Sequence, residues 1–263
     1  MDVNKIKFRA SSMGNLQTDP RSKTELISET AKSELCKAYA FARAGIEDQI
    51  DSKYLEKGNK REELGITYYS RKMKAMYKKN EYRISDDVCT GLPDLYIGES
   101  IENAEIIPDI KNAYSYTSFL KTITQPIAKD RYWQGQTYMR LTGAKEAHFV
   151  VCCINAPIEM ISDERRGAMF KMGISDEDDP AYIEKCLKIE RSMIMDMDEF
   201  LKEYPHAELY TRTHTDISTF VNIPWEERIH IMKVERNQFS IDEIEKKAPL
   251  WRTYIQETFI DKK

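Results

Sequence analysis

An almost continuous apolar run, Ala147 to Ile154, follows a segment of helical spacing that ends at Gly143. The run has the composition of a strand buried on both faces. Glycine commonly ends a helix because it tolerates the left-handed backbone conformation found there. These two features predict a helix followed directly by a central, buried strand.

The rest of the chain extends this pattern of helices and strands. Apolar residues near a 3.6-residue period predict helices at 24–44, at 51–79 with a break near Gly58 or Gly65, and at 126–142. Short extended runs at 87–90, 94–97 and 104–110 predict a β-meander between the second and third helices. Beyond residue 156 the pattern predicts one long helix at 179–204, a strand at 228–234, and a terminal helix opened by a Ser240–Glu243 capping box.

Composition limits the class of protein. The chain has 263 residues, of which 41% are hydrophobic and 32% charged, enough for one sizeable core in one domain or one domain with an appendage. No apolar run approaches the roughly 20 residues that cross a bilayer. The first residues lack the apolar stretch of a signal peptide. We therefore expect a protein of the cytoplasm without membrane association.

Charge and cysteine content narrow the partners and the chemistry. A net charge of −4 argues against coating of nucleic acid by the whole surface, yet a basic segment that begins with Arg71 and Lys72 could form a local DNA contact. Alternatively, this segment is a solvated helix face without a nucleic-acid partner. The five cysteines show no Cys-x-x-Cys spacing, and we expect reduced thiols in the core.

One acidic-x-Lys triplet lies in a setting suited to chemistry. The chain contains four such triplets, but only 109–111 (Asp-Ile-Lys) falls in an expected strand. Residues two apart in a strand point to one face, so Asp109 and Lys111 would project together while Ile110 faces the core and leaves its carbonyl available. Asp94, at the start of the preceding strand, could pair with Asp109 and place two carboxylates within the span of one metal ion.

Two further segments could complete such a site. Gln134 and Tyr138 are four apart on an expected helix and share a face. They could form a polar pair at the edge of the core, or a supporting layer that orients Lys111, a carboxylate or a phosphate oxygen. Glu62, on the earlier helix, could supply a third carboxylate. Cutting a phosphodiester needs carboxylates to hold divalent metal and a lysine to orient or deprotonate water.

In order along the chain, the segments 58–62 (Gly-Asn-Lys-Arg-Glu), 91–94 (Gly-Leu-Pro-Asp), 109–111 and 134–138 (Gln-Gly-Gln-Thr-Tyr) resemble the PD-(D/E)XK nuclease superfamily. Within it they are similar to the branch of RecB-type nuclease domains and lambda-type phage exonucleases. The segment 132–143, which ends in Thr142 and Gly143, is the most specific. The resemblance covers roughly residues 8–155.

The resemblance implies a restriction-endonuclease-like α/β core with a mixed central sheet flanked by helices. We expect this core at 1–155 and a C-terminal α/β extension at 156–263, packed on the same domain. The resemblance also implies Mg²⁺ or Mn²⁺ as cofactor and hydrolysis of DNA. It assigns metal binding to Glu62, Asp94, Asp109 and the Ile110 carbonyl, and water activation to Lys111.

The chain departs from the family pattern in places. Asp109 stands where glutamate is more usual, and Leu92 stands where lambda-type enzymes carry a serine that helps to bind a terminal phosphate. Arg9, Ser11 and Ser12 resemble a serine-bearing helix start that can hold an anion. No cysteine lies beyond Cys186, so we expect none of the iron–sulfur clusters that some relatives carry.

Three functions stay open from the sequence. The first is an exonuclease on linear double-stranded DNA in phage-type recombination, working in the host cytoplasm. The resemblance also suggests a single-strand annealing protein as partner and assembly into a homo-oligomer. The second is a restriction-type or structure-specific endonuclease, and the third is a non-catalytic DNA-binding protein on the same fold.

Overall fold

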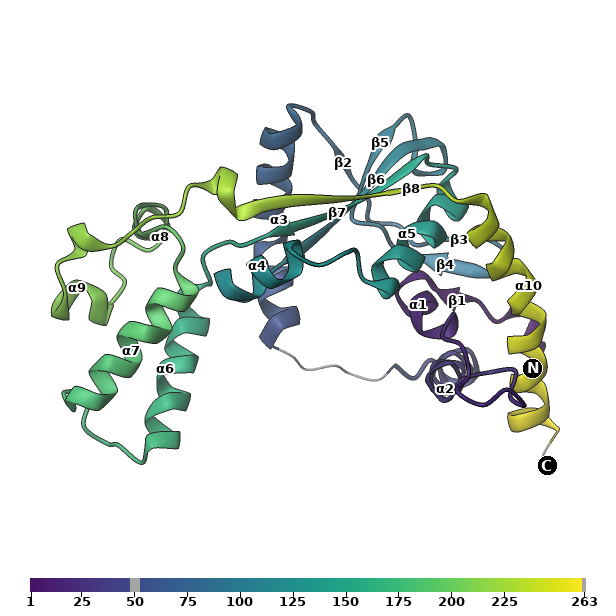
Figure 1. Ribbon diagram of the computed structural model, residues 1–263, viewed down its shortest axis with the longest axis horizontal. Coiled ribbons are helices and arrows are strands. Elements are labelled where there is room, and N and C mark those ends of the chain that lie inside the picture. Colours follow the sequence, from purple (N-terminus) through teal and green to yellow (C-terminus); the bar gives the residue numbers. More distant parts are fainter. Residues whose placement is uncertain (48–52, 262–263) are drawn as a thin grey trace.

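A mixed five-stranded sheet forms the centre of the molecule (Figure 1). The structure is a computed structural model that describes residues 1–47 and 53–261. The strand order is β2–β5–β6–β7–β8, in which only β6 and β7 are parallel. The strands are β2 (Lys78–Lys79), β5 (Leu95–Gly98), β6 (Ala104–Asn112), β7 (Glu146–Cys152) and β8 (Ile229–Glu235). The expected mixed α/β core is confirmed.

A second, smaller sheet corrects the predicted meander. It contains β1 (Phe8–Arg9), β4 (Cys89–Gly91) and β3 (Ile84–Ser85), in the order β1–β4–β3. The run at 87–90 therefore pairs with the N-terminal segment and not with the run at 94–97. Only β5 and β6 form the antiparallel pair that was expected. Strand pairing across about eighty residues, between Phe8 and Cys89, leaves no local signal in the sequence.

Two helices cover opposite faces of the central sheet. Helix α3 (Lys53–Met73) contributes Tyr68 and Tyr69 to an apolar cluster with Ile110, Val150 and Cys152. Helix α5 (Lys129–Thr142) contributes Tyr138 and Met139 to a cluster with Ile107 and Phe149, whose side chains point the other way. The apolar strand that the sequence predicted is β7, and Gly143 ends α5 with φ +77°.

The first two long helices differ from their predicted bounds. Helix α2 (Glu29–Ala44) begins later than residue 24 because the Ser28 side chain accepts the Ala31 N–H and caps it. Helix α3 runs unbroken through Gly58 and Gly65 and ends at Met73. Lys78 and Lys79, which were expected at the end of this helix, form strand β2. Residues 51 and 52, the expected start of that helix, lie outside the described residues.

The second half of the chain divides between a helical lobe and the core. The lobe holds α6 (Ile158–Met172), α7 (Pro180–Met193), α8 (Met197–Glu203) and α9 (Tyr210–His214). The single helix predicted at 179–204 is wrong: the Asn155 side chain accepts the N–H groups of Met195 and Asp196, and Asp196 then caps α8. The chain returns through β8 to α10 (Gln238–Ile255), which is capped by Asn237 and not by the predicted Ser240–Glu243 box.

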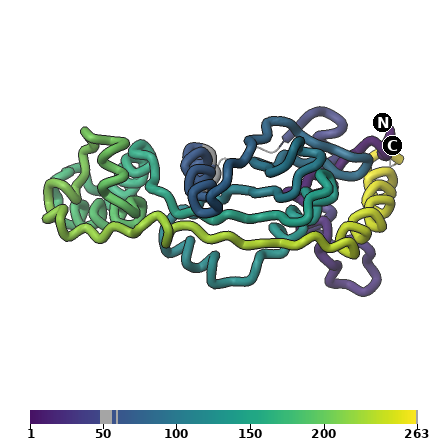
Figure 2. Tube along the Cα trace, turned by 90° about the horizontal axis from the view of Figure 1, so that it is seen from above, coloured from purple at the N-terminus to yellow at the C-terminus, as the bar shows by residue number. Residues whose placement is uncertain are grey.

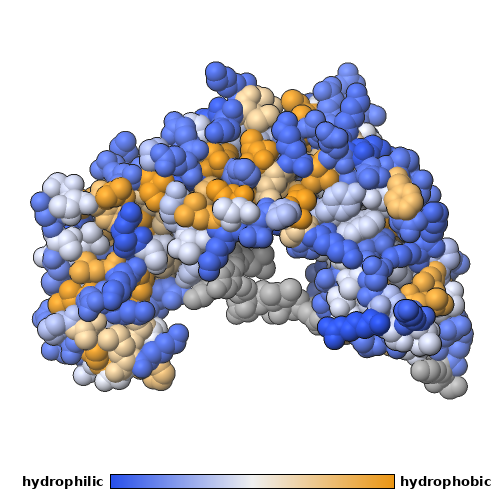
Figure 3. Space-filling model, in the orientation of Figure 1, coloured by the Kyte–Doolittle hydropathy of each residue, from blue (hydrophilic) through white to orange (hydrophobic). Residues whose placement is uncertain are grey.

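The remaining elements are short. They comprise α1 (Met13–Leu16), α4 (Tyr116–Ile123), the 3₁₀ turns η1 (Val3–Lys5), η2 (Ala10–Ser12), η3 (Ile101–Asn103), η4 (Ile217–Thr219) and η5 (Trp225–Arg228), and the π-helical turn η6 (Gln256–Ile260). Seen from above, the helical lobe lies at one end of an elongated molecule and both termini lie at the other (Figure 2). The space-filling view shows a broad hollow between the two ends (Figure 3). Among the described residues, no helix combines the length and apolar composition needed to cross a bilayer.

Candidate active site

Strand β6 carries the expected acidic and basic pair on one face. Lys111 Nζ lies 2.5 Å from Asp109 Oδ2, as the two-residue period of a strand predicts. The Asp109 side chain is 3% exposed and that of Lys111 is 37% exposed. Burial alone would lower the pKa of Lys111, but the carboxylates of Asp109 and Asp94 outweigh it and raise that pKa. The lysine is therefore a cation at neutral pH.

Asp94 lies beside this pair and is fixed to the backbone between its members. Its Oδ2 accepts the Ile110 N–H at 2.8 Å. Burial, followed by repulsion from Asp109, raises the pKa of Asp94 to about 7. The N–H and C=O of a strand residue point to the same side, so the Ile110 carbonyl is directed toward Asp94. Asp94, just before β5, therefore lies close enough to Asp109 for the two charges to repel each other.

The Gln134–Tyr138 pair supports the turn that carries Asp94. Gln134 Nε2 donates to the Tyr138 hydroxyl at 2.9 Å, and that hydroxyl donates to the Leu92 carbonyl at 3.3 Å. A Cβ on Gly91 would lie 2.9 Å from the Tyr138 ring, so this position needs glycine. Burial, then the charge on Asp109, raises the pKa of Tyr138 well above its usual value and keeps the hydroxyl a donor. The motif residues Gly91, Gln134 and Tyr138 thus act on one turn.

Helix α3 approaches the other face of β6 closely. A Cβ on Gly65 would lie 2.5 Å from the Ile110 side chain, whereas one on Gly58 would meet nothing within 4 Å. The close contact therefore depends on Gly65, which the motif does not include. Lys57, fully buried at the start of α3, donates to the carbonyls of Ala113 and Tyr114 just after β6 and fixes the helix along the strand.

Glu62 forms an ion pair with a lysine outside the four motifs. Its Oε1 lies 3.3 Å from Lys79 Nζ, and Lys79 also pairs with Glu63. Glu62 belongs to α3, on the Ile110 face, whereas Asp109 and Lys111 point to the α5 face. Its charge still contributes to the raised pKa of Asp94. Within residues 1–47 and 53–261, no three His, Cys, Asp or Glu side chains are grouped closely enough to hold one metal ion.

Asp94, Asp109 and the Ile110 carbonyl fit a hard divalent cation. Their oxygens are the donors that Mg²⁺ and Mn²⁺ prefer. Asp109 Oδ2 is buried and, within the described part of the chain, lacks a well-directed hydrogen bond despite its contact with Lys111. Two neighbouring carboxylates, one of them with a strongly raised pKa, indicate repulsion that a cation relieves. To bind the metal ion, as the resemblance implies, Glu62 would have to give up its ion pair with Lys79.

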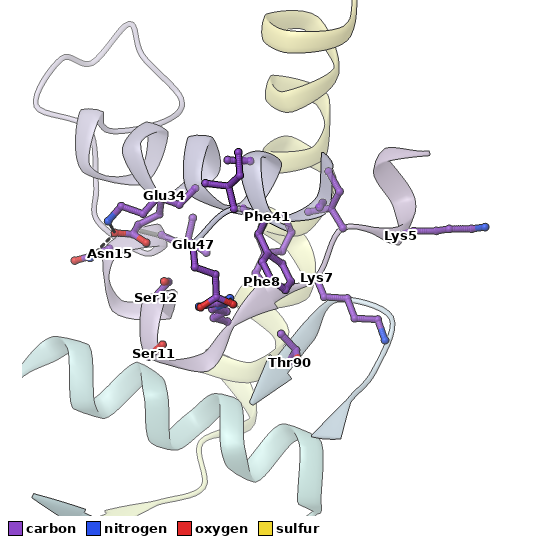
Figure 4. A pocket seen from close by; sticks show the side chains of 18 of the residues that line it. Lys5, Lys7, Phe8, Ser11, Ser12, Asn15, Glu34, Phe41, Glu47 and Thr90 are labelled. Atoms are coloured by element: carbon purple, nitrogen blue, oxygen red, sulfur yellow. Dashed lines mark hydrogen bonds and ion pairs between the residues drawn. The ribbon is translucent and has the colours of Figure 1, made fainter. Parts of the chain in front are cut away.

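The predicted anion-binding residues Arg9, Ser11 and Ser12 line a cavity of about 780 Å³. In Figure 4, Ser11, Ser12 and Thr90 lie on one side of it, and Glu34 and Phe41 of α2 on the other. Arg9 does not extend freely into this space, because it pairs with Glu47 and lies 4.8 Å from the centre of the Phe41 ring. Ser11 and Ser12 are the last two residues of the 3₁₀ turn η2, and Ser12 is the N-cap residue of the four-residue helix α1.

The basic segment on α3 is only partly helical. Arg71 and Lys72 are exposed on the last helical turn, as expected. Lys78 and Lys79 follow on β2, where Lys78 donates to the carbonyls of Gly98 and Glu99. The helix predicted to continue to residue 79 therefore ends at Met73, and the later lysines of the basic segment are not helical. Four of the five cysteines are buried as predicted, but Cys36 is exposed.

Solved structures share this fold. The chain aligns with a phage-related exonuclease from Haemophilus somnus 129PT over 97% of both chains, with 20% identity and a TM-score of 0.64. It aligns with LHK-Exo, an alkaline exonuclease from Laribacter hongkongensis, over 97% of this chain and 90% of that one, with 14% identity and a TM-score of 0.56. LHK-Exo in complex with dAMP aligns with the same identity and TM-score. No protein-family model matches the sequence, and no curated protein matches it. The chain therefore has the fold of the phage-related and alkaline exonucleases, as its four motifs predicted.

Proposed function

We propose that this protein is a Mg²⁺- or Mn²⁺-dependent deoxyribonuclease that acts as an exonuclease on linear double-stranded DNA. The observation that carries the proposal is the arrangement on β6, where Asp109 and Lys111 share a face and Asp94 is bonded to the N–H of Ile110 between them. The shared fold supports it, since the similar structures are exonucleases and one of them holds dAMP.

The residues of the site have separate roles in hydrolysis. Asp94, Asp109 and the Ile110 carbonyl would hold the divalent ion, which supplies Lewis-acid polarisation of the phosphate when bound. Lys111 is placed to orient the attacking water beside these carboxylates. The water oxygen forms a new bond to phosphorus and its proton passes to solvent, while the bond from phosphorus to the leaving oxygen breaks and that oxygen takes up a proton from solvent. Gln134 and Tyr138 keep Asp94 in place through the Leu92 carbonyl.

The partners and the place of action stay predictions. Phage-type recombination, a single-strand annealing partner and a homo-oligomer come from the family resemblance, and action in the cytoplasm comes from the composition of the sequence. The pairing of Arg9 with Glu47 means that binding of a phosphate by Arg9, Ser11 and Ser12 would require this ion pair to open.

End dependence distinguishes the proposed exonuclease from the alternatives. The protein is incubated with Mg²⁺ and three forms of one duplex: linear, linear with hairpin-capped ends, and closed circular. An exonuclease consumes only the uncapped linear form, with progressive shortening. Conversion of the circle to discrete fragments would establish an endonuclease. Binding of all three forms without cleavage would establish the non-catalytic alternative.

A further inference from the structure

Arg131 lies in the first turn of α5, three residues before Gln134 and seven before Tyr138. Residues with this spacing share one face of a helix. The Gln134 and Tyr138 side chains on that face are bonded to each other, and the hydroxyl continues to the turn before Asp94. Arg131 therefore belongs to the face of α5 that covers Asp109 and Lys111.

The guanidinium of Arg131 has no anionic partner among the described residues. Its Nη1 is buried and lacks any hydrogen bond in the part of the chain that the structure describes. Arg140, nine residues later on the same helix, forms ion pairs with carboxylates. Its Nε lies 2.6 Å from Asp86 Oδ2 and its Nη1 lies 2.5 Å from Glu245 Oε1. A buried donor without a partner destabilises the folded state, more so when it is charged, so the contrast with Arg140 indicates a group that binds an absent anion.

The charges around Arg131 indicate what that anion is. Its positive charge lies close enough to Lys111 for the two cations to repel each other. The carboxylates of Asp94 and Asp109 are therefore matched by two cations. A divalent ion on the carboxylates would leave the site positive overall, and the anion that a positive, metal-bearing nuclease site attracts is a phosphodiester.

We propose that Arg131 binds a non-bridging oxygen of the scissile phosphate. The proposal rests on the proposed nuclease function and adds a substrate-contacting residue that the four motifs do not contain. Lys111 is paired with Asp109, whereas Arg131 Nη1 has no partner among the described residues, and the planar guanidinium can donate two parallel hydrogen bonds to phosphate oxygens. Arg131 exchanges no proton. It stabilises the charge that grows on these oxygens as the bond to water forms and the bond to the leaving strand breaks.

The first test is single-turnover cleavage of a linear duplex with Mg²⁺ by the wild type, Arg131→Gln and Arg131→Lys. The control is Arg166→Gln, because Arg166 is 78% exposed on α6 and pairs with Asp163, three residues earlier on the same helix. Loss of one donor to a developing oxyanion typically costs ~10²–10³-fold in rate, which we expect for Arg131→Gln. Arg131→Lys should lose less, because it keeps the charge but not the fork. The control should match the wild type.

The second test measures DNA binding in EDTA as a function of salt, together with the melting temperature. Loss of one phosphate contact should lower the slope of log K against log salt by about 0.9 on duplex DNA for Arg131→Gln. Arg131→Lys should keep the wild-type slope. A wild-type rate for Arg131→Gln overturns the proposal, and so does a reduced rate with an unchanged slope, which would mark a structural role. If the wild type cleaves no DNA, the nuclease proposal fails, while the salt slope still decides whether Arg131 binds phosphate.

Discussion

Replacing Asp94 with asparagine should stabilise the metal-free protein above pH 7. Burial, followed by repulsion from Asp109, raises the pKa of Asp94 to about 7, compared with about 4 in an unfolded chain. The folded protein therefore keeps a proton that the unfolded chain releases, and it loses stability as the pH rises from about 4 to about 7. Asparagine removes the charge and can still accept the Ile110 N–H.

The magnitude follows from the pKa difference. Each tenfold change in proton affinity corresponds to about 1.4 kcal/mol, so the upper limit is about 4 kcal/mol. Screening by solvent and relaxation around Lys111 reduce this, and we expect a gain of about 1–2 kcal/mol in the free energy of unfolding at pH 8. For a chain of this size the gain corresponds to about 2–8 °C in melting temperature.

The assay is thermal unfolding in EDTA at pH 5 and pH 8, with Asp163→Asn as the control because Asp163 is 61% exposed. Asp94→Asn should melt above the wild type at pH 8, and the difference should shrink at pH 5. Added Mg²⁺ should stabilise the wild type more than the variant, because a ligand has been lost. A variant that melts below the wild type at pH 8, or differs from it equally at both pH values, would refute the reasoning.

Three further changes test the supports of the site. Gln134→Ala should slow single-turnover cleavage by roughly 10–100-fold, because the turn before Asp94 loses the support of the Gln134–Tyr138 pair. An unchanged rate would show that this pair contributes only packing. Gly65→Ala should cost about 1–3 kcal/mol of unfolding free energy by overpacking against Ile110, whereas the matched helical change Gly58→Ala should cost nothing; equal effects would contradict the close contact. Lys79→Ala should tighten Mg²⁺ binding, measured by calorimetry, because it releases Glu62; weaker binding would exclude Glu62 as a ligand.

The parts of the site that the sequence predicts are those fixed by local periodicity. The two-residue period of a strand places Asp109 with Lys111, and the helical period places Gln134 with Tyr138. The apolar composition of β7 and the glycine after α5 likewise specify their elements without help from distant residues.

The parts that the sequence misses depend on contacts between distant segments. Glu62 pairs with Lys79, which lies on β2 and not on the helix that the sequence predicts at 51–79. The sequence therefore does not predict this ion pair. The break between α7 and α8 depends on Asn155, about forty residues earlier. The spacing of Arg131 to Gln134 is visible in the sequence, but it is the lack of a partner for Arg131 Nη1 among the described residues that distinguishes this arginine from others on helices.

The central claim is that the β6 pair performs metal-dependent cleavage of DNA. The most direct measurement is release of nucleotides from a linear duplex by the wild type, Asp109→Ala and Lys111→Ala, each with Mg²⁺ and with EDTA. We expect release by the wild type with Mg²⁺ alone, and none by either variant although both keep the wild-type circular dichroism spectrum. A wild type that releases nothing with Mg²⁺ or Mn²⁺, or a folded variant that releases nucleotides at the wild-type rate, would contradict the account.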